Sequence, residues 1–469
     1  MEKYYLAVDI GASSGRHILG HLENGKIELE EIYRFENGMD HKDGKLLWNV
    51  ERLFGEILNG MKKCKELGKL PVSMAIDTWA VDYVLLDEKD QILGDTYGYR
   101  DHRTDGMDAE VVKILPEPEL YARTGIQKQI FNTIYQLMAV EKKTPEIMKQ
   151  AKTLLMLPDY FGFRLTGNKL SEYTNGSTTQ LVDPHTYQWD KEMIQSLGYP
   201  EAIFLPLKMP GTKVGNLLPQ IREEVGYDLE IVLCGSHDTA SAVMAVPQTE
   251  GDGIYISSGT WSLMGIESLE PIITKEAATA NFTNEGGYDY RFRFLKNIMG
   301  LWMIQSVRHE YQDAYSFAQL CDMAEESRDF SSRVDVNDQS FLSPDSMIEA
   351  IKQYCQKTGQ PVPETVGELA AVVYRSLAQS YGETVKELET IAGRTYDSIH
   401  IIGGGSNAAY LNQLTAEATG KIVYAGPGEA TAIGNLLAQM IHAGDLADLK
   451  GARQCVRDSF EIKTYVPEN

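Results

Sequence analysis

The chain has 469 residues, which is too long for one small core and suits two large domains of roughly 100–200 residues each. With 43% hydrophobic and 24% charged residues, its composition is that of a globular protein, neither disordered nor fibrous. The 44 basic and 67 acidic residues give a net charge of −23, which disfavours nucleic acid and anionic membranes as partners because both require a positive surface. A small anionic ligand stays compatible with this charge, because a few local donors can hold a phosphate.

The start of the chain and its cysteines give no indication of export or membrane insertion. No apolar run approaches the roughly 18 residues of a membrane span, and residues 1–5 lead into a strand pattern without a signal peptide. The five cysteines are scattered and include no C-x-x-C pair, so neither a disulfide framework nor a zinc site is expected. These features predict a reduced, cytoplasmic compartment.

The first predicted elements are three antiparallel strands, at residues 5–10, 16–22 and 27–35. Small residues at 11–15 predict a turn after the first strand, and Asn24 followed by Gly25 is a strong hairpin signal after the second. Apolar residues at helical spacing then predict a helix over 50–67, which Asn49 can cap.

Two further strands are predicted at 72–77 and 81–87. Three antiparallel strands, a helix and a returning strand are typical of a ribonuclease-H-like domain. A strand at 231–235 and a helix at 239–245 follow much later, and the strand–turn–strand pattern then recurs over 253–265. This recurrence predicts a duplication at the scale of a domain. The predicted domains are residues 1–246 and 247–469.

After the second hairpin comes a polar stretch, 311–360, for which the sequence supports no assignment. Thr365 and Glu368 then have capping-box spacing at the start of a long helix predicted over 366–391. The elements predicted after it are a strand at 398–402, a helix at 408–419, a strand at 421–425 and a helix at 429–441.

An aspartate beside a hairpin of small residues is the first candidate site. Asp9 lies in a strand beside the turn 11–15, where a carboxylate can hold Mg²⁺ and turn N–H groups can cradle phosphate. A plain hairpin, whose glycines only satisfy turn geometry, explains the same residues. A second hairpin of this kind at 257–260 favours phosphate binding, because two matching turns could grip one polyphosphate, although the duplication could also be purely architectural.

A third candidate is the run Gly-Gly-Gly-Ser-Asn at 403–407, between a strand and a helix. A turn without side chains lets a flat ligand lie against the backbone and leaves N–H groups free at the helix start. Taken alone, a tight turn is the simpler interpretation. The chain contains neither the P-loop motif nor a G-x-G-x-x-G dinucleotide fingerprint in the right context.

A fourth candidate is the run Ser-His-Asp-Thr at 236–239, which follows a buried strand and begins a helix. Asp238 could act as a general base on a substrate hydroxyl, but an aspartate here could equally cap the helix, and His237 could be a structural histidine. Carboxylates and aromatic residues at 77–83, and the charged turn at 99–103, are weaker candidates for a sugar site, because sheet edges and solvated loops share this composition.

Taken together, the two hairpins, the glycine turn and the aspartate between them resemble the FGGY carbohydrate kinases of the actin-like ATPase superfamily. The resemblance runs through nearly the whole chain. Residues 77–82, 236–239 and 296–302 resemble most specifically the branch that acts on L-rhamnulose. The implied fold is α/β, with two ribonuclease-H-like domains of the actin and hexokinase type and a catalytic cleft between them.

The implied activity is ATP-dependent transfer of the γ-phosphoryl group to the 1-hydroxyl of L-rhamnulose, with Mg²⁺. By position in the family's motifs, Asp238 would be the catalytic base and Asp9 a magnesium-associated carboxylate. The residues implied to bind ATP are Ala12, Ser13, Ser14, Gly15, Arg16, Thr260, Gln305 and Gly404. The residues implied to contact the sugar are Ala80, His237, Asp238, Thr239 and Asn297.

One departure and two alternatives accompany this resemblance. Ala80 stands where close relatives can have glycine, so its methyl group could crowd the sugar. The alternatives are an FGGY kinase for another substrate, such as L-fuculose, D-xylulose or a polyol, and a non-metabolic actin-like ATPase. We expect sugar and ATP as ligands and no nucleic acid or membrane partner; the oligomeric state, monomer or dimer, stays open.

Overall fold

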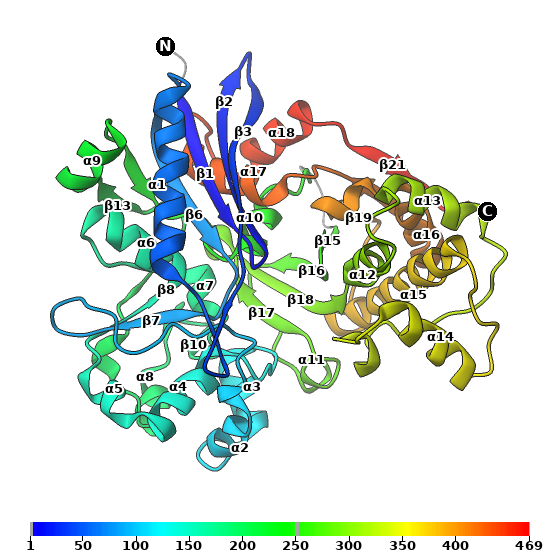
Figure 1. Ribbon diagram of the computed structural model, residues 1–469, viewed down its shortest axis with the longest axis horizontal. Helices are drawn as coiled ribbons and strands as arrows, with labels where there is room; N and C mark the ends of the chain where they lie inside the picture. Colours follow the sequence, from blue (N-terminus) through cyan, green and yellow to red (C-terminus); the bar gives the residue numbers. More distant parts are fainter. Residues whose placement is uncertain (1–2, 249–252, 469) are drawn as a thin grey trace. The chain divides into compact units, whose positions relative to one another are not determined.

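The computed structural model describes residues 3–248 and 253–468, and the chain divides into two compact units (Figure 1). Unit 1 comprises Met1–Ala245, Glu267–Phe294 and Thr431–Ser459, and unit 2 comprises Val246–Ile266, Leu295–Ala430 and Phe460–Asn469. The domain boundary expected near residue 246 stays a prediction, because the units group segments by contact and the chain returns to unit 1 twice.

Unit 1 is built on a six-stranded sheet with the strand order β13-β14-β6-β1-β2-β3. Its strands are β1 (Tyr4–Ile10), β2 (Ser14–Glu23), β3 (Lys26–Glu36), β6 (Pro71–Thr78), β13 (Lys213–Asn216) and β14 (Glu230–Val232). Strand β1 pairs antiparallel with β2 and parallel with β6. The three N-terminal strands, the helix after them and the returning strand β6 are therefore confirmed.

Each face of this sheet is covered by a helix, as the alternation of side chains along β1 requires. Leu6 and Val8 belong to a core with helix α1 (Val50–Glu66), which begins where Asn49 accepts a hydrogen bond from the Arg52 N–H at 3.0 Å. Tyr5 and Ala7 face the other way, toward helix α17 (Ala430–His442). Gln439 of α17 donates to the Leu6 carbonyl at 3.0 Å, and with the apolar contacts of α17 this bond ties the segment 431–459 to unit 1.

The rest of unit 1 forms a second core beside the sheet, centred on helix α4 (Thr133–Lys143). The residues expected to form a strand at 81–87 form the shorter β7 (Tyr83–Leu86), which lies outside the main sheet and pairs with β8 (Thr153–Met156). Its other helices are α2 (Met107–Val112), α3 (Glu117–Thr124), α5 (Pro145–Gln150), α6 (Leu157–Thr166), α7 (Tyr173–Ser177), α8 (Lys191–Ser196), α9 (Pro219–Val225), α10 (Asp238–Met244), α11 (Lys275–Thr279) and α18 (Leu449–Ser459). Its short strands are β4 (Asp40–Lys42), β5 (Lys45–Leu47), β9 (Ser171–Glu172), β10 (Val182–Asp183), β11 (Gln188–Trp189), β12 (Leu207–Lys208) and β17 (Thr283–Gly286).

Unit 2 repeats the theme of a hairpin beside a parallel strand. Strand β15 (Ile254–Ser258) pairs antiparallel with β16 (Trp261–Ser268) and parallel with β19 (Ser398–Ile402). The sheet continues through β20 (Ile422–Ala425) to β21 (Lys463–Tyr465), and β18 (Phe292–Met299) lies on the far side of β16. Strands β16 and β18 each begin in one unit and end in the other.

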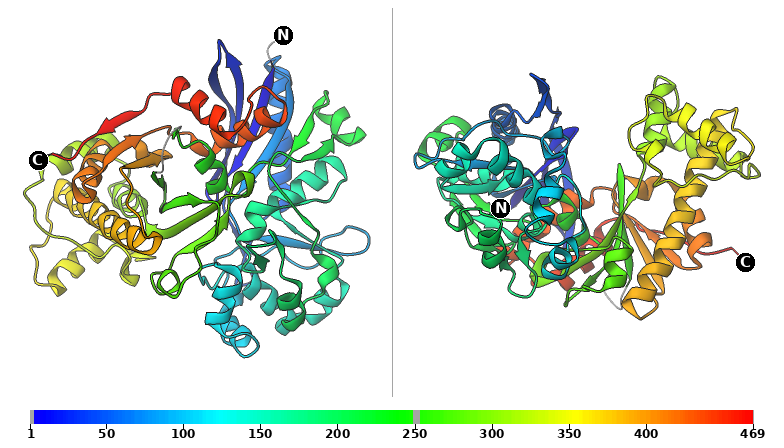
Figure 2. Two further views of the ribbon diagram at one scale, coloured as in Figure 1. Left: turned by 180° about the vertical axis from the view of Figure 1, so that it is seen from behind. Right: turned by 90° about the horizontal axis from the view of Figure 1, so that it is seen from below.

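Helices cover the sheet of unit 2, and the longest is α15 (Val366–Ala392). It packs against α13 (Phe317–Glu326) and α16 (Ala409–Thr419). In Figure 2 α15 is the long yellow-orange helix. The capping box of Thr365 and Glu368 is confirmed. The polar stretch without an assignment contains α13 and α14 (Met347–Lys357), and α12 (Trp302–Glu310) precedes it.

Two expectations from composition can be compared with the described residues. All five cysteines are buried and free, as the absence of a cysteine pattern predicted. None of the helices within residues 3–248 and 253–468 is long and apolar enough to span a membrane.

Candidate active site

The site is centred on the turn that leads from β14 into α10, because the backbone there is held at the end of the sheet. Ser236 accepts a hydrogen bond from the Thr78 N–H at 2.9 Å, so the turn lies beside the end of β6. His237 occupies the N-cap position with extended dihedral angles, and its side chain makes no capping hydrogen bond. Asp238 is the first residue of the helix and not its N-cap, although its carboxylate accepts an N–H of the first turn.

The Asp238 carboxylate is held through one of its two oxygens. Oδ1 accepts hydrogen bonds from the Thr239 N–H at 2.6 Å and the Thr239 hydroxyl at 3.1 Å, and it lies 3.5 Å from His237 Nε2. Oδ2 has no hydrogen-bond partner among these neighbours, and a third of the side chain is exposed. Burial raises the pKa of Asp238 above its usual value, and the Asp9 charge adds to this, while His237 and Thr239 oppose it.

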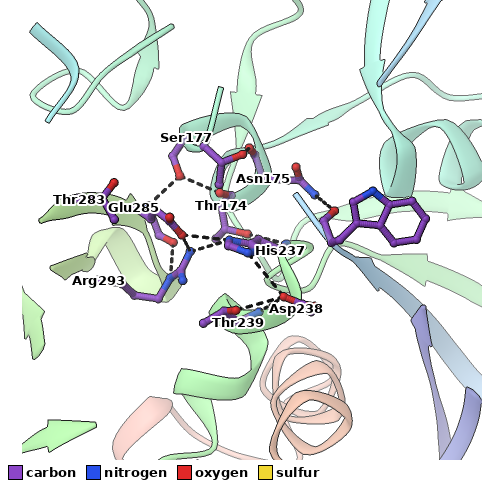
Figure 3. A network of polar contacts seen from close by, with 12 residues as sticks. Thr174, Asn175, Ser177, His237, Asp238, Thr239, Thr283, Glu285 and Arg293 are labelled. Carbon is purple, nitrogen blue, oxygen red and sulfur yellow. Dashed lines mark hydrogen bonds and ion pairs between the residues drawn. The ribbon is translucent and has the colours of Figure 1, made fainter. Parts of the chain in front are cut away.

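The Nδ1 side of the His237 ring contacts the buried ion pair of Arg293 and Glu285 (Figure 3). Arg293 Nη2 donates to Glu285 Oε2 at 2.9 Å and lies 3.0 Å from His237 Nδ1, while Nε donates to the Gly286 carbonyl. Burial alone would raise the pKa of Glu285, but Arg293 and His237 outweigh it and lower this pKa to about 2. No pattern in the sequence pointed to Glu285 or Arg293, because neither belongs to a motif and both lie on strands far along the chain from His237.

A second buried acid anchors the turn itself. Glu172, which is fully buried, accepts hydrogen bonds from the Ser236 hydroxyl at 2.6 Å and from the Thr174 hydroxyl at 2.7 Å. It also accepts the backbone N–H groups of Thr174 and Asn175 at the start of α7. Glu172 therefore ties α7 to the residue two positions before Asp238. Sequence reasoning missed it, because a single Glu among polar residues carries no local pattern.

Two further carboxylates lie at the end of neighbouring strands of the same sheet. Asp9 on β1 and Asp77 on β6 are register partners. Arg16 donates two hydrogen bonds to Asp9 Oδ2, at 3.0 and 2.9 Å, and Asn435 donates to Asp77 Oδ2 at 2.6 Å. Burial, followed by the negative charges of Asp9 and Asp238, raises the pKa of Asp77 well above its usual value.

The oxygens of these two carboxylates fit a hydrated magnesium ion. Asp77 Oδ1 is buried without a hydrogen-bond partner, as expected for an oxygen whose partner is a metal-bound water. Among the described residues, no group of three or more His, Cys, Asp or Glu side chains could hold a metal ion. Mg²⁺ does not need such a cage, because it commonly binds through one or two carboxylates, waters and substrate phosphates.

The first hairpin has the expected turn geometry. Gly11 donates to the Ser14 carbonyl at 2.8 Å, and Asn37 closes the loop through the Gly11 and Ser13 carbonyls. Ala12 is partly exposed and Ser13 is exposed. A Cβ atom on Gly15 would lie 2.1 Å from the Phe35 ring, so a side chain there would require this ring to move.

In unit 2, three of the expected nucleotide segments lie next to one another. Thr260 accepts a hydrogen bond from the Trp302 N–H at 3.1 Å, and this bond holds the second hairpin at the start of α12, the helix that carries Gln305. The glycine turn adjoins the same hairpin, because a Cβ atom on Gly403 would lie 2.9 Å from the Ser258 carbonyl oxygen. Gly404 faces open space, with no atom within 4 Å of an added Cβ atom.

The aspartates of the 77–82 motif have different environments. Asp82 is buried and accepts hydrogen bonds from the Trp48 and Trp79 indoles, the Tyr99 N–H and the Gln136 amide. Burial raises the pKa of Asp82 to about 6, although the four hydrogen bonds lower it in part. Asp82 therefore organises the loop that carries Ala80, and it has no free oxygen for a ligand. Asn297, in unit 2, is partly buried on β18.

Comparisons with known proteins agree with this architecture. The N-terminal domain of the FGGY family of carbohydrate kinases matches residues 4–245, and the C-terminal domain of that family matches residues 254–443. A xylulose kinase from Lactobacillus acidophilus superposes with a TM-score of 0.79 at 16% identity, covering 99% of this chain and 94% of that one. A glycerol kinase from Plasmodium falciparum gives 0.77 at 13% identity, covering 100% and 95%. The fold is therefore the two-domain fold of the sugar kinases, as expected.

Curated relatives are much more similar in sequence. Rhamnulokinase of Halalkalibacterium halodurans is 54% identical over 463 residues, covering 99% of this chain and 98% of that protein. The rhamnulokinases of Oceanobacillus iheyensis and Bacillus subtilis are 50% and 47% identical, each over 99% of this chain and over 98% and 96% of those proteins. The chain belongs to the FGGY family of carbohydrate kinases and is an ATP-dependent sugar kinase, which confirms the prediction made from its motifs.

Proposed function

We propose that this sugar kinase transfers the γ-phosphoryl group of ATP to the 1-hydroxyl of L-rhamnulose and forms L-rhamnulose 1-phosphate. The observation that carries the proposal is the carboxylate of Asp238, which is fixed through Oδ1 and presents Oδ2 without a partner among the side chains around it. The name shared by relatives that are 47–54% identical over nearly the whole chain supports this choice of sugar.

In this proposal Asp238 orients the sugar hydroxyl and accepts its proton on Oδ2 as the O–P bond forms. Phosphoryl transfer requires little covalent work from the protein, so catalysis consists of positioning and charge stabilisation. The pKa of Asp238 is raised, which makes its carboxylate a better proton acceptor than an ordinary aspartate. The proposed sugar contacts are Ala80, His237, Thr239 and Asn297.

We also propose which residues bind ATP and Mg²⁺. Asp9 and Asp77 would hold Mg²⁺ through water, and the ion would offset the charge of the β- and γ-phosphates when it is bound. The unpartnered Asp77 Oδ1 supports this assignment. The proposed ATP contacts are Ala12, Ser13, Ser14, Gly15, Arg16, Thr260, Gln305 and Gly404. A cytoplasmic location is part of the proposal, because the reaction consumes ATP.

A panel of substrates tests the proposed reaction. Purified protein with ATP and Mg²⁺ should phosphorylate L-rhamnulose with a higher kcat/KM than L-fuculose, D-xylulose or glycerol, measured as ADP formation. Omission of Mg²⁺ in the presence of a chelator should abolish the reaction. A higher kcat/KM for any other member of the panel would contradict the choice of sugar and leave the family assignment intact.

A further inference from the structure

A chain of buried amide groups connects helix α17 to the carboxylate of Asp77. Gln439 donates to the Leu6 carbonyl at 3.0 Å and to Asn435 Oδ1 at 2.8 Å. Asn435 donates in turn to the Ala75 carbonyl at 3.2 Å and to Asp77 Oδ2 at 2.6 Å. Asn435, Gln439 and Asp77 are fully buried, so bulk water does not compete for these hydrogen bonds.

The orientation of the Asn435 amide follows from the Ala75 carbonyl. A backbone carbonyl only accepts hydrogen bonds, so the NH₂ end of Asn435 must face it. The second hydrogen of this NH₂ group reaches Asp77 Oδ2. In the flipped amide, Asn435 Oδ1 would lie against two oxygens, and its NH₂ group would oppose the NH₂ group of Gln439. Asp77 Oδ2 therefore faces a donor whose orientation is fixed.

Close packing fixes the position of this donor along the chain. Asn435 follows Gly434, and a Cβ atom on Gly434 would lie 1.7 Å from the carbonyl oxygen of Ser241. Ser241 belongs to α10, the helix that begins at Asp238. Helix α17 is thus held by α10 at Gly434 and by β1 and β6 through its two amides, so it has little freedom to slide or turn.

We propose that Asn435 is a positioning residue of the magnesium site, which holds Asp77 by Oδ2 and so presents Oδ1 to a metal-bound water. The role of Asn435 rests on the proposed assignment of Asp77 to Mg²⁺. Asp77 Oδ1 is buried without a hydrogen-bond partner, so the carboxylate has the Asn435 donor on one oxygen and an open position on the other. Without that donor the carboxylate is free to rotate, and neither oxygen keeps a fixed place.

Binding of Mn²⁺ to the complex of the protein with ADP tests this role without turnover. Free Mn²⁺ gives a sharp electron paramagnetic resonance spectrum that is lost on binding, and a titration without protein corrects for Mn²⁺ bound by ADP alone. Asn435→Ala should raise the Kd of Mn²⁺ about 10- to 100-fold, the usual effect of removing a group that holds a metal-binding side chain in place. The Mg²⁺ concentration for half-maximal ADP formation should rise in parallel, and the KM for the sugar should stay close to that of wild type.

The matched control is Gln439→Ala, which removes an amide of the same helix one turn further along. This variant loses the bonds to Leu6 and Asn435 and a third bond, which the Ser73 hydroxyl donates to Gln439 Oε1 at 2.7 Å. The Ala75 carbonyl still orients Asn435. We expect Gln439→Ala to lower the melting temperature at least as much as Asn435→Ala does and to keep the wild-type Mn²⁺ affinity. Equal losses of affinity in both variants, or none in Asn435→Ala, would leave Asn435 with a structural role and overturn the proposal.

Two further variants keep the outcome decisive. Asn435→Thr fills more of the space of the original side chain and lacks the amide donor, so it replaces Asn435→Ala if that variant does not fold. Asp77→Asn tests the proposed metal assignment itself. If Asp77→Asn binds Mn²⁺ as wild type does, that assignment fails and the role of Asn435 fails with it. If Asp77→Asn weakens binding and Asn435→Ala does not, only the role of Asn435 is overturned.

Discussion

Three aspartates in unit 1 differ in what their oxygens contact, and the contacts separate structural from chemical roles. Asp82 accepts hydrogen bonds on both oxygens from indole, amide and backbone donors, so neither oxygen is left for a ligand and its role is structural. Asp77 retains one buried oxygen without a partner, and Asp238 is bound through Oδ1 alone. The buried Asp77 oxygen lacks a partner and the Asp238 side chain is one-third exposed, and this distinguishes both residues from Asp82, whose oxygens are all bonded.

The replacement Asp238→Asn tests the proposed base. Asparagine preserves the shape and the hydrogen bonds at Oδ1, so we expect a folded protein whose melting temperature is close to that of wild type. It cannot accept the proton, and loss of a general base typically reduces kcat by about 10²–10⁴-fold. Steady-state ADP formation measures kcat, and ATP binding by calorimetry serves as the control. A variant that keeps most of the wild-type turnover would contradict the assignment.

At the scale of secondary structure, the packing of α1 against β2 depends on one glycine. A Cβ atom on Gly60 would lie 2.1 Å from the ring of His17, whereas a Cβ atom on Gly55 would meet nothing within 4 Å. Both glycines belong to α1, so they share the cost that glycine imposes on a helix. The two positions therefore separate intrinsic helix propensity from tertiary packing.

Alanine at these two positions should have opposite effects. Gly55→Ala should raise the free energy of unfolding by about 0.5–1 kcal/mol through helix propensity. Gly60→Ala should lower it by about 1–3 kcal/mol, because the added methyl group overpacks the interface with His17. Urea unfolding monitored by circular dichroism measures both variants. Stabilisation by Gly60→Ala would show that α1 moves away from β2 at little cost.

His17 itself should make the stability of unit 1 depend on pH. Burial lowers the pKa of His17 from 6.5 to about 4. The hydrogen bond to the Ile57 carbonyl raises this pKa, but its effect is smaller than that of burial. In the unfolded chain His17 becomes protonated near pH 6.5, whereas in the folded protein it stays neutral until the pH approaches 4. The contribution of neutral His17 to stability is therefore complete above pH 6.5 and is lost as the pH falls toward 4.

The variant His17→Gln does not titrate and isolates this effect. Between pH 7.5 and pH 5, wild-type protein should lose about 2 kcal/mol more unfolding free energy than the variant, from the linkage between protonation and folding. Comparing the two proteins cancels the titration of the other groups. If both lose the same free energy over this range, His17 is protonated in the folded protein.

At the scale of the whole molecule, the question is whether ATP turnover depends on the sugar. In a kinase, the substrate completes the catalytic arrangement, and water is a poor substitute because it makes few of the contacts that position a sugar hydroxyl. We expect ADP formation to rise at least about 10²-fold when L-rhamnulose is added, in keeping with the effect of positioning on rate. Rapid ADP formation without any sugar would instead support a free-running actin-like ATPase.

The sequence by itself determined the features that depend on neighbouring residues. Strand-like runs bounded by turn residues predicted the first three strands, helical spacing and the Asn49 cap predicted α1, and a capping box predicted the start of α15. Small-residue turns marked the hairpins, and the Ser-His-Asp-Thr run marked the start of α10. These signals are local because propensity, capping and turn geometry act within a few residues.

Only the tertiary structure decided which distant groups meet. The register of β1 with β6 places Asp9 beside Asp77, and hydrogen bonds from α17 bring residues near the C-terminus into unit 1. Glu172, Glu285 and Arg293 reach the turn before Asp238 from segments that no local pattern marks as functional. Strand pairing and burial bring residues together irrespective of their separation along the chain. Which distant residues meet is therefore set by the packing of the whole unit and not by any one stretch of sequence.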